Sequence, residues 1–165
     1  MKFLSLLSIV FFSSSVWALP GAELAKDKNP SLTSSSLEGV QLGDIFTSEY
    51  LVVDISMLFC PYCRNMAEEH NNDQDFQKMF ASETCNFIVV VPDDDREGWI
   101  AEYPVDTFIG ERTYSYSESM RNFAKLFGLS LRGVPTVMVL DRAGELVAQA
   151  PGETPKEVYE LCGVE

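Results

Sequence analysis

The sequence is poor in basic residues and contains a single histidine. Its 165 residues include 12 Lys and Arg against 25 Asp and Glu, and the formal net charge is −13. A chain with this charge is repelled by the phosphates of DNA and RNA and by anionic lipid. The composition therefore argues against nucleic-acid binding, while acidity by itself indicates solubility and identifies no partner.

Long apolar runs are absent after the first residues, so no membrane span is expected in the mature chain. Residues 1–18 contain one early charge, Lys2, an apolar core over 3–12 and small residues ending at Ala18. This is the layout of a secretory signal peptide cleaved after Ala18. The alternative, an uncleaved membrane anchor, is disfavoured because the apolar run is short for a span. No cysteine lies near the cleavage site, which argues against a lipoprotein.

Lys2 is the only charged residue that cleavage would remove. The mature chain would therefore have 11 basic and 25 acidic residues and a net charge of −14. Residues 19–38 show no sustained periodicity and include Asn29, Pro30 and three consecutive serines. We expect a low-order N-terminal tether there. The remainder, residues 39–165, predicts one domain with a genuine core, and no internal repeat is present.

Only two of the four cysteines lie close together, in the stretch Phe59-Cys60-Pro61-Tyr62-Cys63. An apolar run over 51–58 predicts a buried strand before them, and residues 64–80 can be helical after them. Cys60 then stands at the N-cap with Pro61 at the first helical position, where a proline is tolerated best. The helix dipole and unpaired N–H groups favour a Cys60 thiolate, and Cys63 is placed to resolve a mixed disulfide. This is the chemistry of thiol-disulfide exchange.

Metal sites are not supported by the spacing of the candidate ligands. A zinc site would need a second cysteine pair, and Cys85 and Cys162 are isolated in sequence. His70 would lie about 10 Å beyond Cys63 along a helix, so we expect it to be a surface or packing residue. Three adjacent aspartates at 93–95 lack the spaced ligands of a calcium loop. Residues 92–98 are therefore expected to form a solvated loop.

The rest of the chain predicts an alternation of strands and helices. Residues 86–91 read as a second buried strand, and 99–116 as an aromatic-rich irregular excursion. A helix is expected over 117–127, ending before Gly128, and then a hairpin of strands 137–140 and 145–150. Thr154, Pro155 and Glu157 form a capping box that opens a helix to about Cys162.

Taken together, residues 40–165 resemble the thioredoxin-fold proteins, through Cys60-x-x-Cys63, Gly133-Val134-Pro135-Thr136 and the order of elements around them. The resemblance implies an α/β fold with a central mixed sheet flanked by helices. The spacing of 72 between Cys63 and Pro135 (135 minus 63) exceeds that of compact thioredoxins, so we expect an insertion between the second core strand and the loop that contains a cis-proline. By resemblance, Pro135 is that cis-proline and the Val134 backbone pairs with an extended substrate segment.

Asp54 lies within the otherwise apolar strand, six residues before Cys60. An ionised carboxylate buried there is costly, so its pKa should be raised, and it could exchange protons with Cys63. Thioredoxins have an aspartate at the matching position, which the family associates with this role. The alternative is an outward-pointing side chain without a function. Phe59, Pro61, Tyr62, Val134 and Pro135 are expected to form the surface that contacts substrate proteins.

Local motifs and overall layout disagree about the direction of electron flow. The pair Pro61-Tyr62 is similar to glutaredoxins and periplasmic isomerases, and Phe59-Cys60-Pro61 resembles DsbA-type oxidants. The overall size of the chain, the insertion and the predicted hairpin of strands 137–140 and 145–150 are similar to those of the exported thioredoxin-like reductases of bacterial envelopes, including the cytochrome-maturation kind. We predict an exported, most simply periplasmic, reductase. The alternatives are a periplasmic oxidant or isomerase, and a copper-handling carrier.

No bound cofactor is predicted, because electrons pass through the dithiol. The expected partners are proteins with disulfides or thiols and a redox partner that recycles the cysteine pair. Cys85 and Cys162 lie outside the redox motif, and in an exported protein the simplest hypothesis is a structural disulfide between them. Two buried thiols or an auxiliary redox pair are the alternatives.

Overall fold

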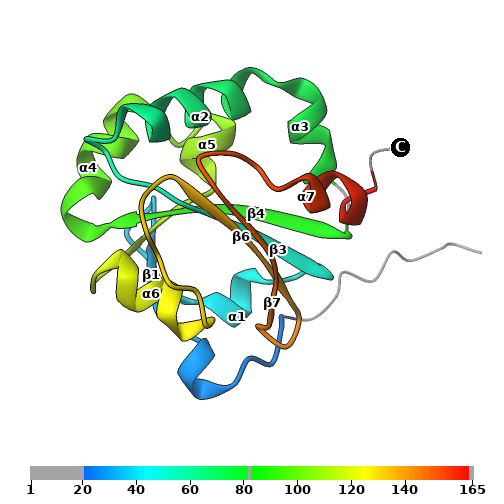
Figure 1. Ribbon diagram of the computed structural model, residues 1–165. Coiled ribbons are helices and arrows are strands. Elements are labelled where there is room, and N and C mark those ends of the chain that lie inside the picture. Colours follow the sequence, from blue (N-terminus) through cyan, green and yellow to red (C-terminus); the bar gives the residue numbers. More distant parts are fainter. Residues whose placement is uncertain (1–20, 82, 164–165) are drawn as a thin grey trace, which may run out of the picture.

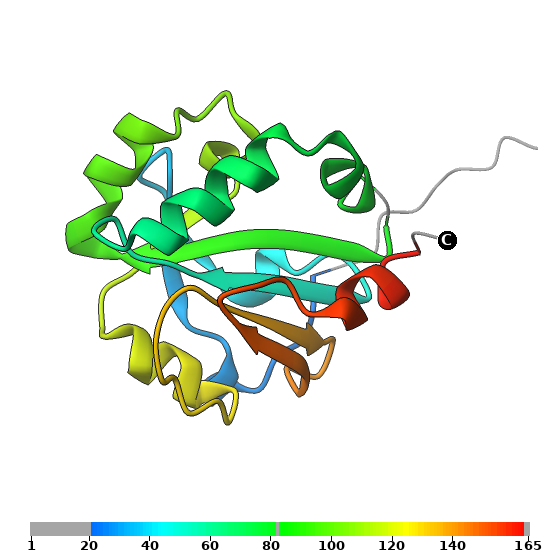
Figure 2. The ribbon, with the colours of Figure 1, turned by 45° about the horizontal axis from the view of Figure 1, so that its top comes forward.

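The computed structural model describes residues 21–81 and 83–163, so the predicted signal peptide lies outside the described residues. A seven-stranded mixed sheet runs through the molecule in the order β2-β1-β5-β4-β3-β6-β7 (Figures 1 and 2). The strands are β1 (Ser31–Ser34), β2 (Gly39–Gln41), β3 (Tyr50–Ile55), β4 (Cys85–Pro92), β5 (Thr113–Tyr116), β6 (Thr136–Asp141) and β7 (Leu146–Pro151). The helices are η1 (Lys26–Lys28), α1 (Leu42–Ile45), α2 (Pro61–Asn72), α3 (Gln74–Met79), α4 (Asp93–Glu102), α5 (Phe108–Glu111), α6 (Met120–Leu126) and α7 (Lys156–Leu161).

Strand β3 lies at the centre of the sheet, parallel to β4 on one side and antiparallel to β6 on the other. Every residue from Leu51 to Ile55 is buried, because helices cover both faces of the sheet. This double burial explains why the strand reads as a continuous apolar run rather than an alternating one. The expected mixed sheet flanked by helices is thus confirmed.

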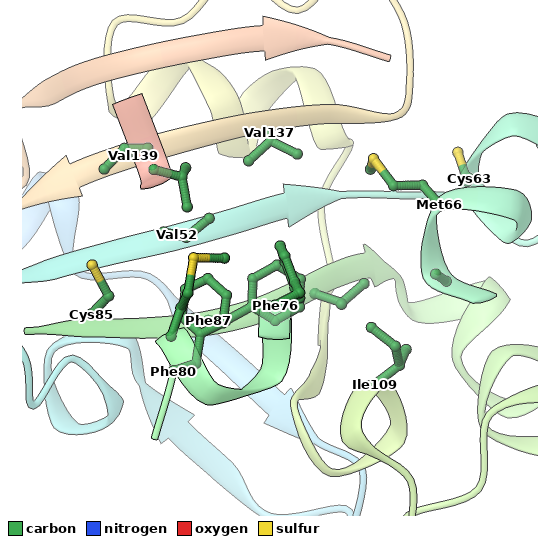
Figure 3. Close-up of a cluster of buried hydrophobic side chains, with 14 of the residues drawn as sticks. Val52, Cys63, Met66, Phe76, Phe80, Cys85, Phe87, Ile109, Val137 and Val139 are labelled. Atoms are coloured by element: carbon green, nitrogen blue, oxygen red, sulfur yellow. The ribbon is translucent and has the colours of Figure 1, made fainter. Parts of the chain in front are cut away.

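Two hydrophobic clusters fill the space on the two faces of the sheet. The first packs residues of α2, α3, α4, α5 and α7 against alternate residues of the central strands, and includes Cys63, Phe76 and Phe87 (Figure 3). The second packs α1, α6 and the N-terminal segment against the opposite face, around Phe46 and Phe123. Successive side chains of β3 point to opposite faces of the sheet. Val52 therefore packs in the first cluster and Val53 in the second.

The expected solvated loop at 92–98 is wrong, because these residues begin helix α4. Pro92 occupies its N-cap and Asp93, Asp94 and Asp95 its first turn. Acidic side chains are favoured beside the positive end of the helix dipole, so the charge run suits a helix start. Together with α5, β5 and α6, α4 makes up the predicted insertion between β4 and β6. The irregular excursion expected over 99–116 is wrong, because the end of α4, α5 and strand β5 lie there.

The expected low-order tether is also wrong where it overlaps β1. This strand pairs antiparallel with β2 and with β5, and its Leu32 is 1% exposed. One buried leucine in a four-residue polar strand gives too little periodicity to be recognised. Within residues 21–81 and 83–163, no helix combines the length and the apolar character that crossing a membrane requires.

Three predicted helices differ from expectation in their bounds. The helix expected over 117–127 begins only at Met120, with Ser119 as its N-cap. The helix expected over 64–80 is interrupted at Asp73, whose carboxylate accepts hydrogen bonds from the backbone N–H groups of Asp75 and Phe76 and so starts α3. The last helix begins at Lys156 with Pro155 at its N-cap and no side-chain cap. The Thr154 hydroxyl lies 3.1 Å from His70 Nε2 instead, so the predicted capping box does not form.

Candidate active site

The redox pair lies at the junction between β3 and α2, as the sequence predicts. Cys60 is the N-cap of α2 and Pro61 its first residue. Cys60 and Cys63 form a disulfide, with 5.2 Å between their Cα atoms. Cys60 is half-buried while Cys63 has no exposed surface.

The first turn of α2 directs a donor at the Cys60 sulfur. The Cys63 N–H lies 3.2 Å from Cys60 Sγ and donates to it. When the pair is reduced, this N–H and the positive helix end favour a thiolate at Cys60. Of the two sulfur-bearing side chains, only that of Cys60 is accessible from the surface, and that of Cys63 is covered.

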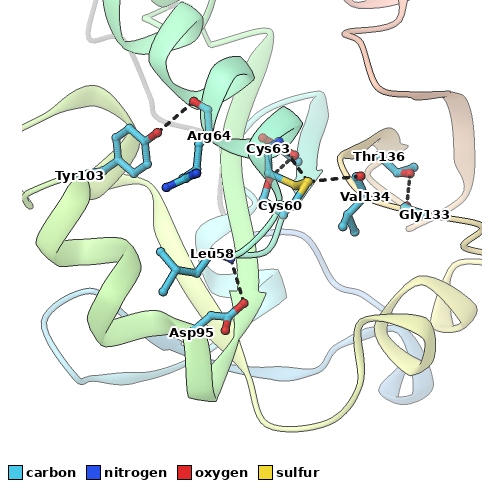
Figure 4. Close-up of a disulfide and its surroundings, with 11 residues drawn as sticks. Leu58, Cys60, Cys63, Arg64, Asp95, Tyr103, Gly133, Val134 and Thr136 are labelled. Carbon is cyan, nitrogen blue, oxygen red and sulfur yellow. Dashed lines mark hydrogen bonds between the residues drawn. A yellow bond between two sulfur atoms is a disulfide. The ribbon is translucent and has the colours of Figure 1, made fainter.

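The loop before β6 lies against the same sulfur (Figure 4). The Val134–Pro135 peptide bond is cis, and the Val134 carbonyl oxygen is 3.5 Å from Cys60 Sγ. The Thr136 hydroxyl donates to the Gly133 carbonyl at 2.8 Å, and the Gly152 N–H donates to the Pro135 carbonyl at 2.8 Å. These bonds hold the loop in place beside the redox pair.

Large apolar side chains surround the pair on the surface. Phe59 is 85% exposed and Tyr62 is 76% exposed, although aromatic side chains are usually buried to a large extent. Pro61 is exposed as well, and Val134 is half-buried. Of the residues predicted to contact substrate, four are thus at least partly accessible near Cys60, whereas Pro135 is buried.

Asp54 is completely buried on the face of β3 that α2 covers. Its partners across the sheet are Val89 and Val137, which belong to the same cluster as Cys63. Burial raises the pKa of Asp54 to about 7, and the hydrogen bond from Ser56 opposes this rise. The Ser56 hydroxyl donates to Asp54 Oδ1 at 2.8 Å, whereas Oδ2 has no hydrogen-bond partner among the described residues.

Helix α4 supplies contacts that the sequence did not predict (Figure 4). Asp95, 7% exposed, accepts a hydrogen bond from the Leu58 N–H at 2.9 Å, two residues before Cys60. The Tyr103 hydroxyl donates to the Arg64 carbonyl of α2 at 2.9 Å. Helix α4 and its C-cap Tyr103 thus hold both the loop before the redox pair and the first residues of α2 after it.

Cys85 and Cys162 form a second disulfide, with 5.4 Å between their Cα atoms. It joins the start of β4 to the end of α7, and both residues are at most 4% exposed. Cys85 pairs with Tyr50 at the first residue of β3, whereas Cys60 follows the other end of that strand. The two disulfides therefore lie at opposite ends of the sheet, as Cys85 and Cys63 do in Figure 3.

His70 is a packing residue, as expected. It is buried, and its ring stacks on Phe76 with 3.9 Å between the ring centroids. Burial lowers the pKa of His70 to about 4, while the nearby Asp73 charge acts in the opposite direction. The imidazole is therefore neutral over the physiological pH range.

A redox-active cysteine pair at a strand-to-helix junction, held beside a cis-proline loop on a mixed sheet, defines a thiol-disulfide oxidoreductase of thioredoxin-like architecture. The thioredoxin-like domain family matches residues 47–161. The chain belongs to this family.

Solved structures from several bacteria share the fold. The thioredoxin domain of a thiol-disulfide oxidoreductase from Bacteroides vulgatus is 15% identical with a TM-score of 0.57, covering 86% of this chain and 94% of that one. A thiol:disulfide interchange protein from Chlorobium tepidum is 15% identical with a TM-score of 0.57, covering 91% and 100%. The exposed lipoprotein thioredoxin of Streptococcus pneumoniae is 15% identical with a TM-score of 0.54, covering 80% and 95%. A search of the curated proteins found no match.

Proposed function

We propose that the protein is an exported reductase of disulfides in other proteins. The observation that carries the proposed thiol-disulfide exchange is the asymmetry of the redox pair. Cys60 is accessible, receives an N–H donor and lies beside the Val134 carbonyl, whereas Cys63 is buried next to it. One cysteine is thus suited to attack and the other to resolve.

The reaction transfers two electrons from the dithiol to a substrate disulfide. The Cys60 thiolate attacks one substrate sulfur and forms a mixed disulfide, and the second substrate sulfur leaves as a thiolate that takes up a proton. Cys63, deprotonated, then attacks Cys60 Sγ and releases the first substrate sulfur as a thiolate, which is protonated in turn. The protein ends with the Cys60–Cys63 disulfide, and a dithiol partner must reduce it for the next cycle.

Asp54 is the proposed proton acceptor for Cys63. A carboxyl group with a pKa of about 7 changes its protonation easily near neutral pH, which suits general acid-base catalysis. Its unpartnered Oδ2 and its place between Val89 and Val137, which belong to the cluster that contains Cys63, support this role.

The proposed direction follows from the charges near the pair. A carboxylate at Asp54 opposes a thiolate at Cys60, and a less stable thiolate makes the dithiol a stronger reductant. Each 30 mV corresponds to about 1.4 kcal/mol. We expect a potential nearer thioredoxin's value of about −270 mV than DsbA's value of about −120 mV.

Substrate contact is assigned to Phe59, Pro61, Tyr62 and Val134, whereas the side chain of Pro135, which was also expected to contribute, is buried. An extended segment would pair with the Val134 backbone, as in strand addition. The exposed aromatic side chains supply apolar contact area on either side of the attacked disulfide.

Export is supported by the signal-peptide layout of residues 1–18 and by the second disulfide. A buried bridge such as Cys85–Cys162 persists in oxidising compartments and is rare in the cytosol. The similarity to an exposed lipoprotein thioredoxin agrees with a location in the bacterial envelope.

Equilibration with glutathione buffers tests the direction, with the Cys60–Cys63 bridge followed by mass spectrometry. A potential near that of DsbA would contradict a reductase. Cys63→Ala should accumulate mixed disulfides with substrate proteins, which identifies them, and Cys60→Ser should form none. Stoichiometric Cu(I) binding without disulfide exchange would instead favour a copper carrier.

A further inference from the structure

A groove of about 420 Å³ opens beside the redox pair, on the side of the cis-proline loop. Its apolar lining includes Met57 from the loop after β3, Met120 from α6 and Val134. Since the Val134 carbonyl oxygen lies 3.5 Å from Cys60 Sγ, a chain segment in this groove lies next to the reacting sulfur.

The charged side chains that line the groove are both cationic. They are Arg121 from α6 and Arg132 from the loop before β6, and no Asp or Glu is among the lining residues. Both arginines are exposed, and neither forms an ion pair with another described residue. In a chain with 25 acidic and 12 basic residues, a groove without a carboxylate is a local reversal of charge.

The neighbouring groove has the opposite sign. It occupies about 440 Å³ and is lined by Tyr62, by further residues of α2 and by the segment that leads to α7. Its charged lining residues, Glu69, Asp73 and Glu153, are all acidic and exposed. Tyr62 of the redox motif lines this acidic groove, whereas Val134 lines the cationic one, so the positive charge is specific to the groove where Val134 is available for pairing.

We propose that the groove between Met57 and the two arginines binds an extended polypeptide segment that has an acidic side chain beside its disulfide cysteine. The proposal rests on the proposed function and specifies its substrate class. A carboxylate next to the cysteine would pair with Arg121 or Arg132, and a lysine there would be repelled. The net charge of −13 opposes acidic proteins at long range, so selection acts on the few residues around the cysteine.

The test uses three peptide disulfides that differ only at the two positions flanking the cysteine, which are Asp, Ser or Lys. The reduced full-length protein is mixed with each, and the second-order rate constant of reduction is divided by that for dithiothreitol. This division removes the effect of flanking charge on the intrinsic reactivity of the disulfide. The normalised rate should be highest for Asp and lowest for Lys, with about a tenfold ratio that shrinks in 0.5 M salt.

Charge reversal shows which residues cause the preference. The double variant Arg121→Glu/Arg132→Glu should invert the preference for Asp over Lys. The milder double variant Arg121→Gln/Arg132→Gln should abolish this preference. Lys78→Glu in α3, an exposed position away from the groove, is the control and should keep the wild-type ratio. Equal normalised rates in the wild type, or a preference that survives in the Glu double variant, would overturn the proposal. Failure to reduce any of the three peptides would overturn the proposed function itself.

Discussion

Asp54 should destabilise the folded protein at neutral and alkaline pH. Its ordinary pKa of 3.8 is raised to about 7 by burial, so between these values the folded protein holds a proton that the unfolded chain has lost. Stability therefore decreases as pH rises from about 4 to 7 on account of this group. The difference between 7 and 3.8, at 1.36 kcal/mol for each pKa unit, makes the penalty about 4 kcal/mol above pH 7.

Asp54→Asn removes this penalty and keeps an oxygen that can accept from Ser56. The oxidised variant should exceed the wild type in free energy of unfolding by up to about 4 kcal/mol at pH 8. The gain is reduced by the unpartnered amide protons, which cost about 1–3 kcal/mol when buried. At pH 4 the two proteins should differ by less, because the wild-type carboxyl group is then protonated.

Urea denaturation of both proteins at several pH values between 4 and 8 measures the difference. Asp106→Asn is the matched control, because Asp106 is exposed between α4 and α5, and it should show no such pH-dependent gain. A difference between wild type and Asp54→Asn that stays constant from pH 5 to 8 would refute the reasoning. It would show that Asp54 is solvated well enough to ionise normally.

Three further predictions concern positioning and stability. Asp95→Ala should cost about 1.5–3 kcal/mol and slow disulfide exchange, because the Leu58 N–H loses its partner, and Asp95→Asn should restore most of the rate. A double Cys85→Ala/Cys162→Ala variant should lose about 4 kcal/mol in denaturation, since the bridge closes a 77-residue separation, yet keep its reactivity at Cys60. In the Asp54→Asn background, stability should fall by about 3 kcal/mol as pH drops from 6.5 to 4, because His70 then protonates more readily in the unfolded chain. His70→Leu should flatten that slope, and an unchanged slope would contradict the assignment.

The sequence predicted those parts of the site that depend on local structure. Cys60 at the N-cap and Pro61 in the first turn follow from a strand, a proline and a helical stretch in immediate succession. The raised pKa of Asp54 follows from one carboxylate in an apolar strand. The loop at Val134 and Pro135 required the resemblance to a family, because an isolated proline at a strand start has more ordinary explanations.

Features that depend on distant parts of the chain were missed. Asp95 lies among three adjacent aspartates, and only the packing of α4 under Leu58 distinguishes it from its exposed neighbours. Strand β1 is held by pairing with β5, about 80 residues further along the chain, which no local pattern reveals. The charge of the groove arises where α6 meets the loop before β6, so Arg121 and Arg132 become neighbours only in the fold.

Direct electron transfer from the Cys60–Cys63 dithiol to a protein disulfide is the most immediate test. The reduced protein is mixed with an equal amount of a disulfide-containing protein under anaerobic conditions, and both are mapped by mass spectrometry after acid quenching. One substrate disulfide should be lost for each Cys60–Cys63 bridge formed, while Cys85–Cys162 stays oxidised throughout. Transfer that persists in Cys60→Ser, or oxidation of the dithiol without loss of a substrate disulfide, would contradict this account.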